Sequence, residues 1–482
     1  MHDVIVIGRD LSSLVAALKA ARTGFKTVLI AEGALEAEHR EEGYGFPLHP
    51  IPLSGFGGGQ TVSRHLRELG RPGEEFPPLL LQDPALQVIL PGHRVDLFQN
   101  RERLLTDLIR EFPGREREAR RFYRAVARAG SIAAGWMDED HPGGRGGSGR
   151  RFRRLLRLPA SIFGRLSLSL RPDHGPFRRV IEAQTVLLSH LDLSGSSFPL
   201  CAGHCLSLPE RGLFYPAGGR NGWINWLRRM FADAGGVLME ECGVIRVETK
   251  PRIRIDLQGP DGSTTLDGRT LIVSTLWEKL NLLLLEQPPF RRLRRRFARF
   301  RAAAYPFCLH MGVHEGGLPE IMAPYVLVVP DETQAPRGRN LVFLETSLSG
   351  ETERAPEKRR AVTATVFLKD SPLRLSDAEL REHAEWILAS LEGFLPFLRE
   401  SIDYIHVEKS IFLSRQNQER FSRKYAARNF FHPGIHTFPP ETPLRRVFLT
   451  GGMLMAGPGF EGEVLSGIHS AILAGNEVRH HE

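Results

Sequence analysis

The chain has 482 residues, of which 41% are hydrophobic and 25% are charged, the balance of an ordinary globular protein. That length exceeds what one simple hydrophobic core accommodates and suits two interwoven domains. No run of apolar residues approaches the ~18 that a membrane-spanning helix needs. The opening residues lead into an apolar segment without a basic leader, so we expect a cytoplasmic protein without a secretory signal.

The first segment of the chain has the order of a dinucleotide-binding βαβ unit. An apolar strand over 3–7 ends in Gly8, and apolar residues at helical spacing follow from Leu11 to Leu18. A second strand over 26–31 then ends at Glu32. Such a unit holds a pyrophosphate at the helix N-terminus and a ribose on the terminal acid. The sequence therefore predicts a Rossmann-type α/β domain.

Two later blocks lead back to this domain. Tyr215-Pro216 and Gly218-Gly219 precede a predicted helix and several short strands. A strand over 447–450, a glycine-rich turn and a helix over 464–478 close the chain. We expect one discontinuous nucleotide-binding domain and an inserted α+β substrate or cap domain. The first comprises 1–75, 206–280 and 431–482, and the second comprises 76–205 and 281–430.

These three blocks, in this order, resemble the flavin-containing amine oxidase and phytoene desaturase superfamily over nearly the whole chain. The resemblance implies an FAD-dependent oxidoreductase that transfers hydride from a small or lipophilic substrate to the flavin, whose chemistry belongs to the cofactor. It places Val244 against the adenine end of FAD. The cofactor-binding residues that it implies are Gly8, Asp10, Leu11, Ser12, Ser13, Glu32, Val244, Gly451, Gly452 and Gly462.

The glycine-rich turn departs from the family pattern GxGxxG at Asp10 and Ser13. The second glycine lets the backbone approach the pyrophosphate, and the third lets helix and strand pack closely. Asp10 instead puts a carboxylate at the N-cap, where it accepts the N–H groups that a phosphate would use. A carboxylate ~4 Å from a phosphate charge, at an effective dielectric constant of ~20, costs about 4 kcal/mol. Such a loss turns nanomolar binding into roughly micromolar binding.

Two other segments also depart from the family. The loop after Glu32 carries four acids between Glu36 and Glu42 where a Gly-Gly-Arg type sequence is usual, and Gly452 stands where an acid is common. These departures support a second hypothesis beside the oxidoreductase: a degenerate relative with weak or no FAD binding that acts as a scaffold or binding subunit. Kinship of fold does not decide between the two. No second fingerprint for NAD(P) occurs.

Other candidate chemistry is sparse. Cys201, His204 and Cys205 are close in sequence, but a structural zinc site needs four ligands and no second Cys/His pair follows, so we expect no metal and buried thiols. Four cysteines do not make a disulfide framework in a chain of this size. His190, His204 and His310 are candidates for a base by residue type alone, and no catalytic residue is assigned.

The net charge is +8, and arginine accumulates in two segments. Residues 145–179 hold ten arginines and one acid, with a predicted amphipathic helix over 151–158. A basic amphipathic stretch of this kind can lie on a membrane surface, so we expect a peripheral membrane contact, on the inner face, through 150–180. The alternative is a helix packed on the substrate domain.

The second arginine-rich segment, 291–301, holds seven arginines and predicts a helix with Leu293, Phe297 and Phe300 on one face. The same two alternatives apply to it. No recognised nucleic-acid motif accompanies either segment, so we expect no nucleic-acid partner. The identity of the substrate and the oligomeric state are not readable from the sequence.

Overall fold

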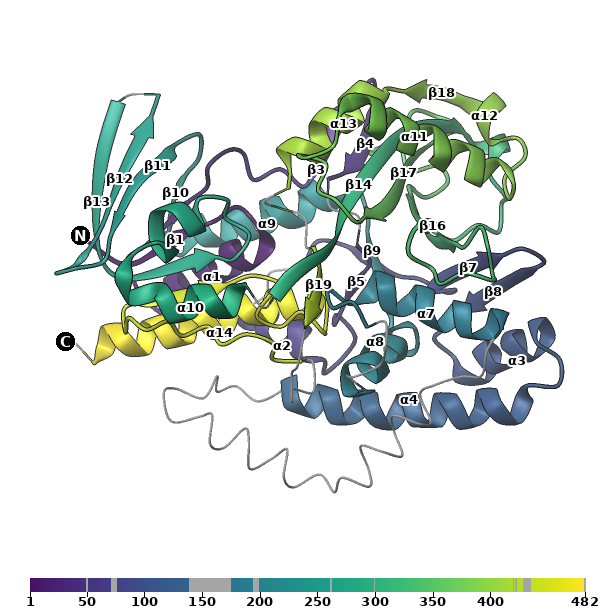
Figure 1. The fold of residues 1–482 in the computed structure, drawn as a ribbon, viewed down its shortest axis with the longest axis horizontal. Coiled ribbons are helices and arrows are strands. Elements are labelled where there is room, and N and C mark those ends of the chain that lie inside the picture. Colours follow the sequence, from purple (N-terminus) through teal and green to yellow (C-terminus); the bar gives the residue numbers. More distant parts are fainter. Residues whose placement is uncertain are drawn as a thin grey trace.

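The computed structural model describes residues 1–48, 51–70, 76–137, 175–193, 199–260, 262–298, 300–418, 420, 423–427 and 435–480. Figure 1 shows two large sheets at opposite sides of the molecule and a group of helices beneath the second sheet.

A seven-stranded sheet forms the nucleotide-type domain. Its strand order is β10 (Val237–Met239), β2 (Thr27–Ile30), β1 (His2–Ile7), β13 (Gly262–Ser274), β12 (Ile253–Gly259) and β11 (Gly243–Glu248), and β20 (Val447–Thr450) also pairs with β13. β1 is parallel to β2 and β13, and β13 is parallel to β20. The central strands are rich in buried valine, isoleucine and leucine, as expected of a parallel sheet covered on both faces. The predicted Rossmann-type fold is therefore confirmed.

Three helices cover this sheet: α1 (Leu11–Arg22), α9 (Arg220–Asp233) and α14 (Phe460–Arg479). In α1, Leu14, Val15 and Leu18 are buried at helical spacing, so the face that the sequence predicted as apolar is the packed face. α14 packs along α1, so the C-terminal segment of the chain completes the unit that the N-terminal segment begins.

The second large sheet belongs to the inserted domain. Its order is β18 (Ile402–Ile405), β14 (Phe300–His314), β17 (Arg359–Leu368), β16 (Gly338–Thr346), β15 (Tyr325–Val328), β7 (Leu86–Leu90) and β8 (His93–Leu97), and β19 (Lys424–Ala427) pairs with β14. The helices α11 (Asp377–Glu392), α12 (Leu398–Ser401) and α13 (Val407–Gln416) lie beside it (Figure 1). Below it lie α3 (Arg101–Glu111), α4 (Glu116–Met137), α7 (Pro176–Leu188) and α8 (Pro199–Arg211).

Smaller elements join the two domains. β3 (Glu38–Glu41) pairs with β4 (Tyr44–Pro47), and β9 (Leu213–Pro216) pairs with both β5 (Leu53–Ser54) and β6 (Leu79–Leu81). The remaining elements are α2 (Thr61–Leu69), the π-helical turn η1 (Asn281–Leu285), the short 3-10 helices η2 (Pro288–Phe290) and η3 (Glu315–Gly317), and α10 (Arg291–Phe297).

The second arginine-rich segment differs from its prediction. The helix α10 ends at Phe297, and Phe300 is the first residue of β14, so the three apolar residues do not share one helical face. Residues 300–302 are in a strand rather than a helix because they pair with β19. The helix predicted over 151–158 lies outside the described residues. Among the helices that are described, none is long and apolar enough to cross a membrane.

A buried network of charges joins the domains. The Arg220 side chain donates to Glu345 Oε2 at 2.7 Å, and its backbone N–H donates to Glu38 Oε1 at 2.5 Å. Arg354, which is fully buried, lies 3.7 Å from Glu345 and 3.9 Å from Glu38. Glu38 and Arg220 come from the nucleotide-type domain, and Glu345 comes from β16. Because unpairing one member strands a charge in the interior, at a cost of about 3–5 kcal/mol, the network holds the domains in one arrangement.

Gly219 is fitted against this network. Its φ is +96°, and a Cβ at this position would lie 2.1 Å from Glu38 Oε1. The second glycine of the pair that precedes α9 is therefore required by the carboxylate of Glu38.

We predict that Gly219→Ala lowers the free energy of unfolding by about 2 kcal/mol or more, through backbone strain and displacement of Glu38. Gly222→Ala is the matched control, because Gly222 lies in the helix α9 itself and a Cβ there would meet no heavy atom within 4 Å. The control should be neutral or stabilising by about 0.5–1 kcal/mol. Urea denaturation measures both, and equal effects of the two substitutions would contradict this account of Gly219.

Candidate functional site

The turn between β1 and α1 is closed by the side chains around it. Gly8 has φ +148°, and a Cβ there would lie 2.3 Å from Ser13 Oγ and 2.6 Å from Ser274 Cβ. Gly8 is therefore needed for the packing of the turn itself. Ser13, at the third position of the glycine pattern, is fully buried against it.

Asp10 occupies the N-cap of α1 and is 7% exposed. Its carboxylate accepts hydrogen bonds from Ser12 Oγ at 2.7 Å, Ser274 Oγ at 3.1 Å and the Ser13 backbone N–H at 3.3 Å. The Ser13 hydroxyl donates to it as well. The carboxylate thus takes the place that a phosphate would take at a helix N-terminus.

Glu32, at the end of β2, is also held by the chain. It accepts from Trp277 Nε1 at 2.5 Å, Lys279 Nζ at 2.6 Å and the Val244 backbone N–H at 2.6 Å. Lys279 Nζ lies 3.3 Å from the Val244 carbonyl oxygen as well. The backbone N–H of Val244 thus bonds to Glu32, and the Val244 carbonyl oxygen and the Glu32 carboxylate bond to residues after β13. Trp277 is 4% exposed.

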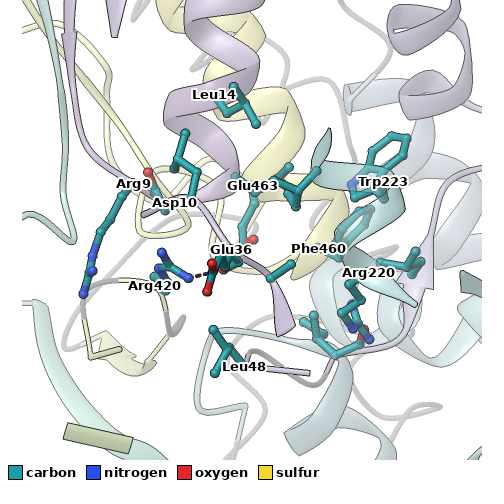
Figure 2. Close-up of a pocket in the computed structure, with 16 residues that line it drawn as sticks. Arg9, Asp10, Leu14, Glu36, Leu48, Arg220, Trp223, Arg420, Phe460 and Glu463 are labelled. Atoms are coloured by element: carbon teal, nitrogen blue, oxygen red, sulfur yellow. Dashed lines mark hydrogen bonds between the residues drawn. The ribbon is translucent and has the colours of Figure 1, made fainter. Parts of the chain in front are cut away.

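Two arginines tie the substrate domain to the nucleotide-type domain, one from the β1–α1 turn and one by binding the loop after β2. Arg9 donates to the carbonyl oxygen of Gln416 at 2.5 Å, and Arg420 donates to that of Glu36. The Arg9 guanidinium also packs against Gly33, since a Cβ on Gly33 would lie 2.8 Å from Arg9 Nη1. Figure 2 shows Arg420 beside Glu36, with Arg9 at the same end of the cavity.

A cavity of about 90 Å³ remains between α1, α9, α14 and the loops around 35–37 and 48–53. Its apolar walls are Leu11, Leu14, Leu35, Ala37, Leu48, Ile51, Leu53, Trp223, Ile224 and Phe460, and its charged lining residues are Arg9, Asp10, Glu36, Arg220, Arg420 and Glu463 (Figure 2). Sites for cofactor-sized molecules enclose about 300–1,000 Å³. This cavity is too small for a dinucleotide, and its walls are mainly apolar.

The N-terminus of α14 carries two buried acids. Glu463 lies 2.9 Å from His190 Nε2, and Glu461 lies 3.7 Å from His204 Nε2 and 3.6 Å from Arg211. An acid in the first turn is favoured by the helix dipole. These groups form an internal polar layer where the terminal glycine-rich loop meets the substrate domain.

The glycines predicted near this helix serve packing. A Cβ on Gly451 would lie 2.3 Å from Thr275 Oγ1, and one on Gly462 would lie 2.0 Å from the Met455 carbonyl oxygen. Gly452 is buried beside them.

The three candidate histidines are enclosed. Burial lowers the pKa of His310 to about 3, and its ring packs on Phe46 at 5.1 Å between centroids. Burial likewise lowers the pKa values of His190 and His204 well below 6.5. The histidines thus have pKa values far from those of a base that works near neutral pH.

The cysteines are buried thiols. Cys205 Sγ donates to the Gly457 carbonyl oxygen at 3.2 Å, and burial is the main cause that raises its pKa. Within the part of the chain that the structure describes, no group of three or more His, Cys, Asp or Glu side chains is placed to hold a metal ion.

Half of the predicted residues lie together around the β1–α1 turn, and Glu32 and Val244 meet each other, but their partners were missed. Asp10, Ser12 and Ser13 meet each other, and Glu32 meets Val244 directly. Ser274, Trp277 and Lys279 supply these hydrogen bonds; Ser274 is the last residue of β13, and the other two follow it. The signal that could have found them is a tryptophan and a lysine directly after a buried strand, opposite a predicted ribose acid.

The comparisons with known proteins concern the fold. No protein-family model and no curated protein matches this chain. An oxidoreductase from Methanosarcina mazei superposes with a TM-score of 0.62 at 14% identity, over 98% of this chain and 99% of that one. Cyclohexylamine oxidase from Brevibacterium oxydans gives 0.58 at 14% identity, over 99% of both chains. Rab GDI from Plasmodium falciparum gives 0.52 at 10% identity, over 97% of both. The chain has the fold of the FAD-dependent amine oxidases.

The residues of this chain do not fit FAD as that fold would hold it. Each of the three groups expected to receive it already has internal partners: the α1 N-terminus has Asp10, Glu32 has Trp277 and Lys279, and Val244 has Glu32 and Lys279. Hydrogen bonds to a charged group contribute about 1.5–3 kcal/mol each, so exchanging these bonds for FAD contacts gives little net gain.

Lys424 is a buried positive charge close to α14. It is buried on β19 and donates to the carbonyl oxygens of Ser189 at 2.6 Å and Leu187 at 3.1 Å. Burial lowers its pKa from 10.5 to about 7. Over the interval between these values the unfolded chain binds one more proton than the folded chain, so the free energy of unfolding rises with pH.

We therefore predict that wild-type stability, relative to Lys424→Met, increases as the pH rises above neutrality, by up to about 1.4 kcal/mol per pH unit. Denaturation curves at several pH values measure this difference. Lys369→Met removes one positive charge from an exposed position and is the control. A difference that stays flat with pH would mean that Lys424 keeps its proton in the folded protein.

Proposed function

We propose that this chain is a binding or scaffold protein built on the amine oxidase fold, in which internal side chains replace FAD. The observation that carries the proposal is the closure of Glu32, Val244 and the α1 N-terminus by the chain itself. A carboxylate at the N-cap supports it further, because a pyrophosphate would face the negative charge of Asp10.

The shape of the interior supports the same function. The cavity that borders Asp10 is about 90 Å³ and mainly apolar, whereas the phosphates and ribityl chain of FAD need polar partners. The contacts Arg9–Gln416 and Arg420–Glu36 join the substrate domain to the β1–α1 turn and to the loop after β2.

The second candidate is an FAD-dependent oxidoreductase acting on a small or lipophilic substrate. The observation in its favour is the fold, together with an acid at the end of β2, where a dinucleotide fold usually binds ribose. The two candidates differ in whether the purified protein carries flavin.

We predict that the purified protein shows no flavin absorption bands in the near ultraviolet and blue, and that added FAD binds no tighter than about 1 μM. Asp10→Gly should strengthen FAD binding by on the order of 100-fold, because the substitution removes the repulsion from the pyrophosphate. Isothermal titration calorimetry measures both constants.

Asn100→Gly is the matched control, because Asn100 caps α3 through its side chain as Asp10 caps α1. That variant should leave FAD affinity unchanged. A wild-type protein that purifies yellow, with one tightly bound FAD per chain, would overturn the proposal in favour of the oxidoreductase. An affinity that does not increase in Asp10→Gly would remove Asp10 as the surrogate for the phosphate.

A further inference from the structure

A basic face with exposed apolar side chains lies on α10 and on η1, and none of the residues in the cofactor region belongs to it. Arg291, Arg292, Arg294, Arg295 and Arg296 are all exposed. Leu293 is 3% exposed and packs the helix onto the protein, so the arginines point outward around a fixed anchor.

The arginines of this face are only partly neutralised. Arg294 pairs with Glu286 at 2.8 Å, and Arg296 lies over the Phe438 ring at 5.1 Å. The side chains of Arg291, Arg292 and Arg295 form no ion pair or hydrogen bond with any residue that the structure describes. Three cationic groups thus stand in solvent on one short helix.

Apolar side chains are exposed beside these charges. Leu282, on η1, is 71% exposed, more than any other large hydrophobic side chain in the described part of the chain. Ile245, on β11, is 53% exposed, and η1 contacts both β11 and α10. An exposed leucine costs solvation free energy that a lipid environment would recover.

We propose that the docking face formed by Ile245, Leu282 and the exposed arginines of α10 binds the surface of a membrane that contains anionic lipids. Arginines attract the negatively charged surface, and the apolar side chains beside them enter the headgroup boundary. This combination favours a membrane over a nucleic acid, because the most exposed apolar side chains beside the arginines, Leu282 and Ile245, are aliphatic and offer no ring for base stacking. The inference is independent of whether FAD is bound.

The test is sedimentation of the full chain with vesicles of phosphatidylcholine, with and without phosphatidylserine. The wild type should pellet with the anionic vesicles and remain in the supernatant with the neutral ones. The triple variant Arg291→Gln, Arg292→Gln, Arg295→Gln should lose on the order of 100-fold in partition coefficient, about fivefold for each arginine.

A matched triple variant controls for the loss of three positive charges. Arg339→Gln, Arg381→Gln and Arg399→Gln alter exposed arginines in the substrate domain, each paired with a glutamate. Figure 1 places α11 and α12, which carry two of them, at the opposite end of the molecule from α10. This variant should keep at least about a fifth of the wild-type partition coefficient, the effect of at most one surface charge.

The apolar part of the docking face is tested separately. Leu282→Ser should weaken vesicle binding about tenfold, whereas Leu373→Ser, which removes a leucine that is 53% exposed in the substrate domain, should leave it unchanged. Melting temperatures of all variants should match the wild type, since these side chains are exposed.

Three results would overturn the proposal. The first is equal recovery of the wild type in the supernatant with both kinds of vesicle. The second is undiminished binding of the α10 triple variant, which would assign the contact to another segment such as 145–179. The third is binding to duplex DNA or RNA that the α10 variant loses while vesicle binding is absent.

Discussion

A carboxylate that is buried on folding needs hydrogen-bond donors in place of water, and this constraint determines how the two domains are joined. In a dinucleotide-binding fold the acid at the end of the second strand meets a ribose, and the first helix meets a phosphate. Here the chain supplies the partners of Glu32 itself, and it supplies the anion at the helix through Asp10. Glu463 lies 2.9 Å from His190 Nε2, and Glu461 lies within 4 Å of His204 and Arg211. The apolar cavity and the tight contact between the domains follow from these internal pairings.

The same constraint explains the joint between the domains. Glu38, Glu345, Arg220 and Arg354 are nearly or fully excluded from solvent, and they come from segments more than 300 residues apart in sequence. Such a network contributes little net stability compared with an apolar core, but it tolerates few alternative arrangements. The positions of β3, α9 and β16 relative to one another are thereby specified.

Much of the fold could be predicted from the sequence, because β-branched runs, glycine turns and helical spacing are local signals. The strand before Gly8, the helix after it and the acid at Glu32 all lie within one short segment. The N-cap role of Asp10 was predictable for the same reason. The partners of Glu32 were not, because Trp277 and Lys279 lie 245 and 247 residues away and nothing local links them to it. The end of α10 was missed because its neighbouring strand pairs with β19, and tertiary pairing overrides a helical pattern.

The closure around Glu32 has a consequence for how such a protein can change over evolutionary time. Loss of Lys279 or Trp277 alone leaves Glu32 short of donors, and loss of Glu32 alone leaves the lysine beside an unpaired carbonyl. Each single substitution that begins to reopen a nucleotide pocket is therefore expected to lower stability before it restores cofactor binding, because the effects of substitutions at these contacting residues are coupled rather than additive. A lineage that has acquired this set of contacts meets an epistatic barrier against return. Its descendants are expected to diversify on their surfaces and to retain the closed interior.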